Sequence, residues 1–235
     1  MKVNKDSISY CLSSISGHGL NSKPEARFCV HRGFVNERRK PNDASSNPDR
    51  PEQTGIALLS CTDIRSPKID QLIDKQSKVQ DGKPASICWW FASTGEQYRI
   101  QANAYIYPPP SLESKFPKFM PAGKTLSPEN MEQVEFDWEA ERRRIFEKIS
   151  PELKASFLRP APGKPLEEVP SDQSSSHWPT EITTDAQKTL ALDRFALIVL
   201  DPLSVDLIKL KVEPNERIQW SKLGDGTWKE TPVVP

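Results

Sequence analysis

The clearest pattern in this chain is the strict alternation of apolar and polar residues from Tyr98 to Ile106. A period of two is typical of a β-strand that has one buried face. Comparable β-rich runs occur on both sides of it, separated by turn residues such as Gly224-Asp225-Gly226. The pattern therefore predicts an antiparallel barrel or sandwich. The other expected strand segments are Ser7–Ile15, Ala26–Val35, Gly55–Thr62, Ala85–Ala92, Phe195–Leu200, Val205–Leu210, Arg217–Leu223 and Thr227–Val234.

Helical spacing appears in two places. One short helix is expected after Pro67, and a longer one is expected near Val134–Ile149. In the longer helix the three consecutive arginines Arg142–Arg144 are predicted to face solvent. The apolar run Ala85–Ala92 predicts a strand buried on both faces.

Prolines divide the sequence. The chain has 22 of them and only 36% hydrophobic residues, which indicates a compact core with long polar loops. We expect one domain over residues 1–235, with loop insertions at 36–54, 107–133 and 166–190.

The overall charge narrows the function. Lys+Arg and Asp+Glu both total 32, so no broad attraction to nucleic acid is expected. No apolar run is long enough to span a bilayer, and we predict a soluble, cytoplasmic protein that does not bind membranes. The cysteines and histidines show no metal-ligand spacing, so no metal site is predicted.

Three clusters could carry chemistry. Arg27 and Arg32 lie five residues apart, so in a flat strand they would face opposite sides, and a shared ligand would require a bend near Arg32. The segment Thr62–Lys68 closes a strand and opens a helix, which suits a phosphate, although Ser66 as an ordinary N-cap explains it equally well. Gln97 begins a strand and could meet the edge of a flat heterocycle, or it could simply lie in a polar turn.

The order of these clusters resembles the pyridoxamine 5'-phosphate oxidase-like family, in particular its uncharacterised cyanobacterial, plant and fungal branch. The resemblance covers nearly the whole chain. It rests on Arg27–Arg32, His31–Phe34, Thr62–Lys68, the Trp-rich strand, Glu96–Ile100, Trp138-Glu139, Ser150–Phe157, Pro160–Leu166 and Asp225–Trp228 with the closing Val233-Val-Pro235.

This resemblance implies a mainly β fold, a six-stranded antiparallel split β-barrel with a few flanking helices. It also implies flavin mononucleotide (FMN) as the cofactor and a homodimer that holds FMN between its subunits. Arg27 and Lys68 would then bind the FMN phosphate, assisted by Thr62 and Ser66.

Three further residues take family positions closer to the flavin ring. Arg32 lies where the family has a basic residue near the ring and substrate, Gln97 where an amide meets the ring edge, and Arg217 where a late-strand arginine reaches the site. We expect an FMN-dependent oxidoreductase acting on a small molecule. No catalytic residue is assigned, and a non-catalytic module that binds FMN or haem is the alternative.

The sequence also departs from the family pattern. An Arg-x-His pair that grips the substrate phosphate in true pyridoxamine-phosphate oxidases is replaced by Glu213-Pro214-Asn215, and an arginine beside Lys68 is replaced by Pro67. A tryptophan expected near the flavin corresponds to Ile208, and the family's N-terminal helix is not seen before the first strand. Pyridoxamine phosphate itself is therefore a poor candidate substrate.

Overall fold

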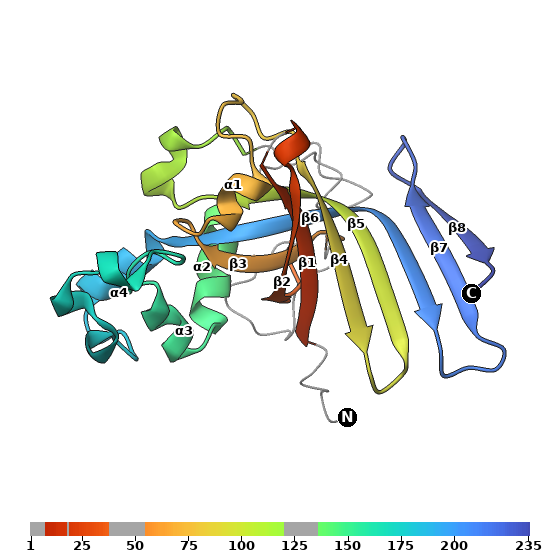
Figure 1. Ribbon diagram of the computed structural model, residues 1–235. Helices are drawn as coiled ribbons and strands as arrows, with labels where there is room; N and C mark the ends of the chain where they lie inside the picture. The colour runs from red at the N-terminus through yellow and green to blue at the C-terminus, as the bar shows by residue number, and fades with distance from the viewer. Residues whose placement is uncertain (1–7, 18, 38–54, 120–135) are drawn as a thin grey trace.

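A computed structural model describes residues 8–17, 19–37, 55–119 and 136–235. It shows an eight-stranded antiparallel sheet with the order β2-β1-β4-β5-β6-β7-β8, in which β3 pairs with β6 off this path (Figure 1). The strands are β1 (Ser9–Ser16), β2 (Lys23–Val30), β3 (Leu58–Asp63), β4 (Lys83–Phe91), β5 (Glu96–Tyr107), β6 (Phe195–Lys209), β7 (Glu216–Lys222) and β8 (Trp228–Val233). The predicted mainly β, open-barrel class is confirmed, with eight strands in the described sheet rather than six.

The long strand β6 differs from the sequence prediction of two short runs. It continues through Pro202, and the register against β5 shifts between Gln101 and Ala102. The unpaired extra residue is Leu203, so the bulge lies on β6 itself, next to the proline that cannot donate a ladder hydrogen bond. One half of β6 pairs with β3 and the other half with β7, so this strand joins the barrel to the β7–β8 hairpin on its far side (Figure 1).

Strand β4 is buried on one face only, so the prediction of a doubly buried strand was wrong. Ala85 and Ile87 point into the core, whereas Cys88 is exposed and Trp90 is 43% exposed. A continuous apolar run does not distinguish a strand buried on both faces from one whose second face meets solvent or a partner.

Two apolar cores flank β3 and β6. The first fills the barrel and includes Tyr10, Leu12 and Ile198. The second lies between these strands and the helices on the other side, around Phe146 and Phe195. The helices are α1 (Lys68–Leu72), α2 (Trp138–Lys148), α3 (Pro151–Ser156) and α4 (Asp185–Leu192), with 3₁₀ turns at Gly19–Asn21, Pro110–Lys115, Leu166–Glu168, Ser171–Gln173 and Ser175–His177.

The arginines of α2 do not form the solvated face that we predicted. Arg142 is 1% exposed and Arg144 is 9% exposed, while Arg143 remains at the surface. Arg142 donates to the main-chain oxygens of Leu192 and Phe195, so it ties α2 to the start of β6. The need to satisfy these buried carbonyls outweighs the cost of burying the guanidinium group.

Two of the three predicted loops are described only in part. Residues 38–54 and 120–133, within the predicted insertions 36–54 and 107–133, lie outside the described residues. The segment 166–190 contains three short 3₁₀ turns, and α4 begins within its end. In the described part of the chain no helix is long and apolar enough to cross a membrane.

Candidate functional site

A cavity of about 480 Å³ opens where the end of β2 meets β3. Its other wall is formed by α3 and the segment that follows it, up to Trp178. The lining residues include four of the seven predicted site residues, namely Arg32, Thr62, Ser66 and Lys68.

A bend at the end of β2 places Arg32 in this cavity. The backbone N–H of Arg32 donates to the carbonyl of Leu59 at 2.8 Å, and Gly33 follows with φ +110°. A side chain is strained at such a φ, so glycine allows the turn that the sequence analysis required. The Arg32 Nε is buried and has no hydrogen-bond partner among the described residues.

The segment Thr62–Lys68 forms the floor of the cavity. Thr62 and Ser66 are buried, and both line the space. Pro67 rather than Ser66 takes the N-cap position of α1, with no side-chain cap bond, so the ordinary explanation for Ser66 does not hold here. Because α1 has only five residues, the local charge comes mainly from the Lys68 ammonium group rather than from a helix dipole.

The pKa values of two thiols on the cavity wall, Cys29 and Cys61, depend on the nearby positive charges. Burial raises the pKa of Cys61, and the charge of Arg32, a hydrogen bond with Arg32 and the charge of Lys68 oppose that shift. Burial also raises the pKa of Cys29, opposed by Lys68 and by Arg27. Lys68 therefore lies within electrostatic reach of both thiols.

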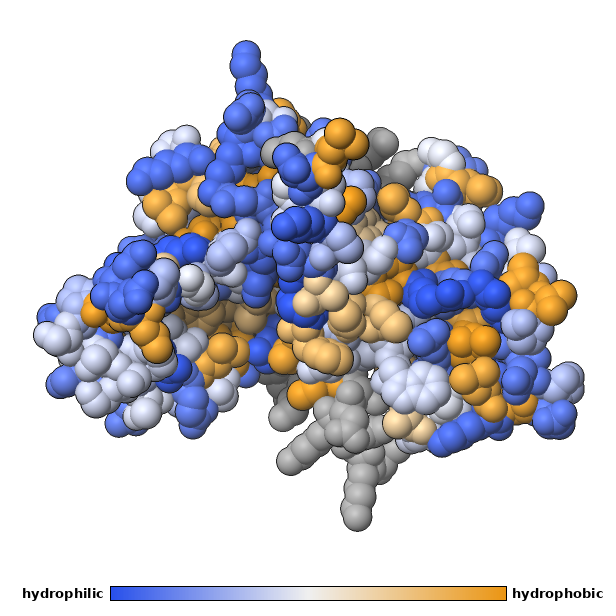
Figure 2. All heavy atoms as spheres, in the orientation of Figure 1, coloured by the Kyte–Doolittle hydropathy of each residue, from blue (hydrophilic) through white to orange (hydrophobic). Residues whose placement is uncertain are grey.

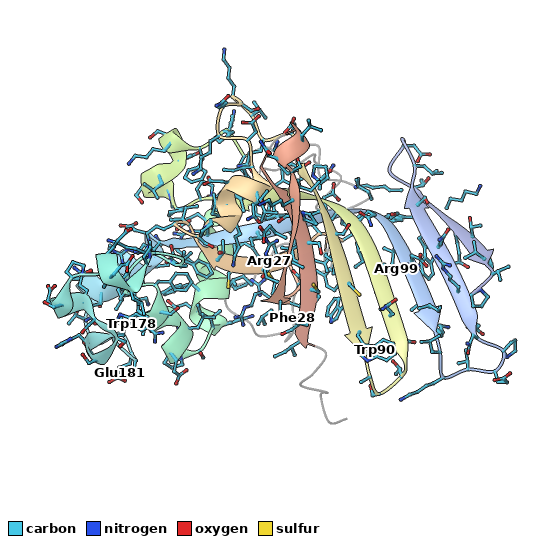
Figure 3. The ribbon with its side chains drawn as sticks, viewed as in Figure 1. Arg27, Phe28, Trp90, Arg99, Trp178 and Glu181 are labelled. Carbon is cyan, nitrogen blue, oxygen red and sulfur yellow. The ribbon has the colours of Figure 1, made fainter. Side chains whose placement is uncertain are left out.

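Arg27 itself is not part of the cavity wall. Its guanidinium donates to Ser14 Oγ at 2.6 Å and to the side-chain oxygen of Gln71 on α1. Ser14 Oγ also donates to that oxygen, at 2.8 Å. In this arrangement Arg27 holds α1, and with it Lys68, against the barrel (Figure 3).

Arg159 is a cavity residue that sequence reasoning missed. Its Nε is buried with no hydrogen-bond partner in the described structure, and its guanidinium lies 5.5 Å from the centroid of the Trp178 ring. Trp178 also lines the cavity, from the lower left of Figure 3. No local pattern marks this arginine, because it follows α3 in an otherwise ordinary turn.

Two other arginines, Arg65 and Arg194, hold the backbone around Arg159 in position. Arg65 binds the carboxylate of Asp63 through two nitrogens at 2.9 and 2.6 Å and also donates to the carbonyl of Arg159 at 3.0 Å. Arg194 donates to the carbonyl of Phe157 at 2.9 Å. The chain after α3 is thus clamped to the end of β3.

The lining of the cavity carries more positive than negative charge. Arg32, Lys68, Arg159 and Lys164 line it, and the carboxylate of Asp63 is already paired with Arg65. Guanidinium groups with unused buried donors bind carboxylate or phosphate oxygens well. The site therefore suits a dianion with an attached apolar or aromatic body.

Gly163 permits the close contact that shapes the cavity mouth. Its φ is +85°, and a Cβ at this position would lie 3.3 Å from the Pro67 side chain. Gly163→Ala is expected to cost about 1–2 kcal/mol of unfolding free energy, because an L side chain is strained at this φ. Urea titration measures that cost, with Ala161→Gly as a control, and an unchanged urea midpoint would contradict it.

Gln97 and Arg217 lie elsewhere, on the outer face of the sheet. Gln97 in β5 is three strands from β2 and Arg217 in β7 is five, or about 14 and 24 Å at the usual strand spacing. Phe28 is 81% exposed on the same face of the sheet as Trp90 and Arg99 (Figure 3). Figure 2 views this face and shows apolar side chains gathered around β2, β1 and β4.

Arg217 is engaged in an ion pair. It donates to Asp206 from Nε at 3.0 Å and from Nη2 at 2.8 Å, and Arg99 lies 2.5 Å from the same carboxylate. Hydrogen bonding from Arg217 is the main cause that lowers the pKa of Asp206 to about 2.

This pKa predicts a specific acid dependence. The folded-state pKa lies below the ordinary value of 3.8, so the stabilisation is present above about pH 4 and is lost as the pH falls towards 2. Asp206→Asn is expected to lower the urea midpoint modestly at pH 6 and to match the parent protein near pH 2. Exposed Asp172→Asn is the control, and a difference that persists at pH 2 would refute this account.

Comparisons with known proteins agree with this fold. Residues 2–108 match the model of the pyridoxamine 5'-phosphate oxidase FMN-binding domain. A pyridoxine/pyridoxamine 5'-phosphate oxidase 2 of Arabidopsis thaliana is 26% identical over 221 residues, covering 92% of this chain and 83% of the relative. The crystal structure of a pyridoxamine 5'-phosphate oxidase-related, FMN-binding protein from Nostoc punctiforme superposes with a TM-score of 0.62 and 22% identity, over 99% of this chain and 90% of that one.

An open antiparallel barrel whose β2–β3 edge carries a cationic cavity defines a split-barrel protein with a site suited to an anionic ligand. These matches confirm the resemblance to the pyridoxamine 5'-phosphate oxidase-like family that the sequence motifs indicated. The matched segment contains six of the seven predicted site residues and ends before Arg159 and Arg217.

Proposed function

We propose that this protein binds FMN and is an oxidoreductase that acts on a small molecule. The supporting observation is the pair of buried guanidinium nitrogens, Arg32 Nε and Arg159 Nε, which have no partner among the described residues and belong to a cation-lined cavity. Buried donors of this kind normally find a partner, and an anionic ligand would supply one.

Lys68 would hold the FMN phosphate from the floor of the cavity, with the Ser66 and Thr62 hydroxyl groups beside it. Arg32, at the end of β2, would lie beside the flavin ring. Arg159, on the opposite wall, would contact either the flavin ring or an anionic group of the substrate. Flavin supplies the hydride chemistry, while the chain binds and orients the reactants.

The active form would be a homodimer. Gln97 and Arg217 are too far along the sheet to reach the cavity of their own subunit, so they would meet FMN only from a second copy. The exposed Phe28 beside the cavity would lie in this interface. Phe28→Glu is expected to convert a dimer into a monomer in analytical ultracentrifugation, whereas the exposed Leu20→Glu should leave the dimer unchanged. A parent protein that sediments as a monomer would rule this arrangement out.

The visible spectrum tests FMN binding directly. Protein purified without added cofactor is expected to carry flavin absorption bands, or to take up FMN when titrated with it. A colourless protein that takes up none would refute the proposal.

A non-catalytic module that binds FMN or haem is the second candidate. It is favoured by the absence of a free general base among the described cavity residues, because Asp63 is paired with Arg65 and the cavity thiols have raised pKa values. Steady-state turnover with amine, alcohol and reduced-nicotinamide donors separates the two functions. A flavin-loaded protein that reduces with none of them would support the module.

A further inference from the structure

A second cavity, of about 720 Å³, lies on the inner face of the sheet and shares no lining residue with the cationic site. Its walls come from two parts of the chain, the segments flanking and opening β3 and the inner faces of β4–β8. Six aromatic rings meet there, those of Phe34, Trp89, Phe91, Tyr98, Trp220 and Trp228.

These rings are only half-buried in the folded chain. On the same inner face, the neighbouring Ile87, Ala102 and Leu207 are at most 5% exposed because the protein's own side chains cover them. Large aromatic rings that point inward but stay partly accessible to solvent indicate a space that the described residues do not fill. A ligand that covers apolar surface of this kind gains roughly 25 cal/mol of binding free energy per Å² of surface removed from water.

The lining of this cavity does not suit a charged ligand. None of the described residues that line this cavity is charged, so an ion entering it would lose hydration without gaining a partner. The Trp220 indole N–H already donates to Glu230 at 2.8 Å. Tyr98 has the one side-chain hydroxyl group among the described lining residues. Its pKa is raised, mainly by burial, so the hydroxyl group stays neutral and can donate a hydrogen bond.

The ring geometry indicates a flat occupant. The Trp89 and Phe91 centroids are 5.1 Å apart, and Phe91 meets Tyr98 edge to face at 5.4 Å. Aromatic rings arranged in this way offer both faces and edges to another planar ring system. The volume also lies in the range of small-molecule sites.

We propose that this inner-face cavity is a second binding site, which takes an uncharged, planar molecule of two or more rings. It is separate from the cationic cavity and does not depend on FMN. The ligand would lie between Phe34 on one wall and the two tryptophans of the β7–β8 hairpin on the other.

Two probes that differ in one charged group test the proposal. N-phenyl-1-naphthylamine is neutral, and 8-anilinonaphthalene-1-sulfonate has closely related rings with an added sulfonate. We expect the neutral probe to bind one per chain with enhanced fluorescence, excited by energy transfer from tryptophan, and to bind at least about tenfold more tightly than the sulfonate. Saturating FMN should leave the neutral probe bound.

Variants locate the site. Trp228→Ala removes one wall on the terminal strand, and Val205→Trp fills the space, so each should weaken the neutral probe by about tenfold or more. Trp178→Ala, which alters only the cationic cavity, should leave it unchanged. Circular dichroism and the urea midpoint verify that each variant is folded, and either folded variant suffices for the test.

Three outcomes would overturn the proposal. The first is unchanged affinity in both cavity variants, and the second is displacement of the neutral probe by FMN. The third is probe binding that appears only as a dimer dissociates, since the cavity would then be an interface between two copies. Preference for the sulfonate would contradict the uncharged ligand class in particular.

Discussion

Lys68→Met should weaken FMN binding by roughly ten- to hundred-fold while leaving riboflavin binding unchanged. A hydrogen bond to a charged group contributes about 1.5–3 kcal/mol, and Lys68 is the ammonium group at the floor of the cationic cavity. Riboflavin lacks the phosphate, so the ratio of the two affinities isolates the contact with that group. Fluorescence quenching titrations of both flavins provide the measurement.

Lys75→Met is a matched control for this experiment. Lys75 lies just beyond the same short helix, pairs with Asp70 at 2.5 Å and does not line the cavity. It should leave both affinities unchanged. Equal losses for FMN and riboflavin in Lys68→Met would mean that the phosphate binds elsewhere.

Arg27 requires a different expectation from the one that the family resemblance implied. Its two terminal nitrogens donate to Ser14 and Gln71, so its alanine variant should act by loosening α1 and should weaken FMN binding less than the loss of Lys68 does. Arg27→Ala that abolishes FMN binding but spares riboflavin would show that Arg27 leaves Gln71 to meet the phosphate.

The strands were predictable because their signals are local. The alternation in Tyr98–Ile106 corresponds to β5, in which Ile100, Ala102 and Ala104 are buried and Arg99 and Gln101 are exposed. The turn at Gly224–Gly226 also joins two strands as expected, with Gly226 at φ +87°. Such patterns depend only on neighbours in the chain.

The cationic cavity was predictable only in part. Lys68, Ser66 and Thr62 form one local motif, and residue order along the chain was enough to group them. Arg159 is placed by contacts with Arg65, which is 94 residues away, so nothing near it in the sequence marks it as a site residue. Tertiary contacts of this kind leave no periodic signal.

The outer sheet face shows a second limit. Trp90 in β4 belongs to an apolar run that predicted burial, yet it is 43% exposed in the single chain. An apolar sequence pattern indicates that a surface is hydrophobic. It does not indicate whether the same chain or a partner molecule covers that surface.

Arg142→Met should lower the free energy of unfolding by about 3–5 kcal/mol, among the largest single-site effects expected in this chain. The Arg142 side chain is almost fully buried and donates to two main-chain oxygens, at 2.8 and 2.9 Å, as well as to Glu139. Methionine fills similar volume but leaves these acceptors unpaired, and unpaired buried groups are costly.

The neighbouring Arg143→Met provides the control, because its side chain is 60% exposed and pairs only at the surface with Glu139. Such pairs contribute about 0–1 kcal/mol. In a chain of this length the Arg142 variant should melt roughly 6–20 °C lower, and the Arg143 variant should melt within a few degrees of the parent protein. Equal melting temperatures for the two variants would mean that α2 is not held to β6 through Arg142, and that the solvent-facing arrangement predicted from the sequence was correct.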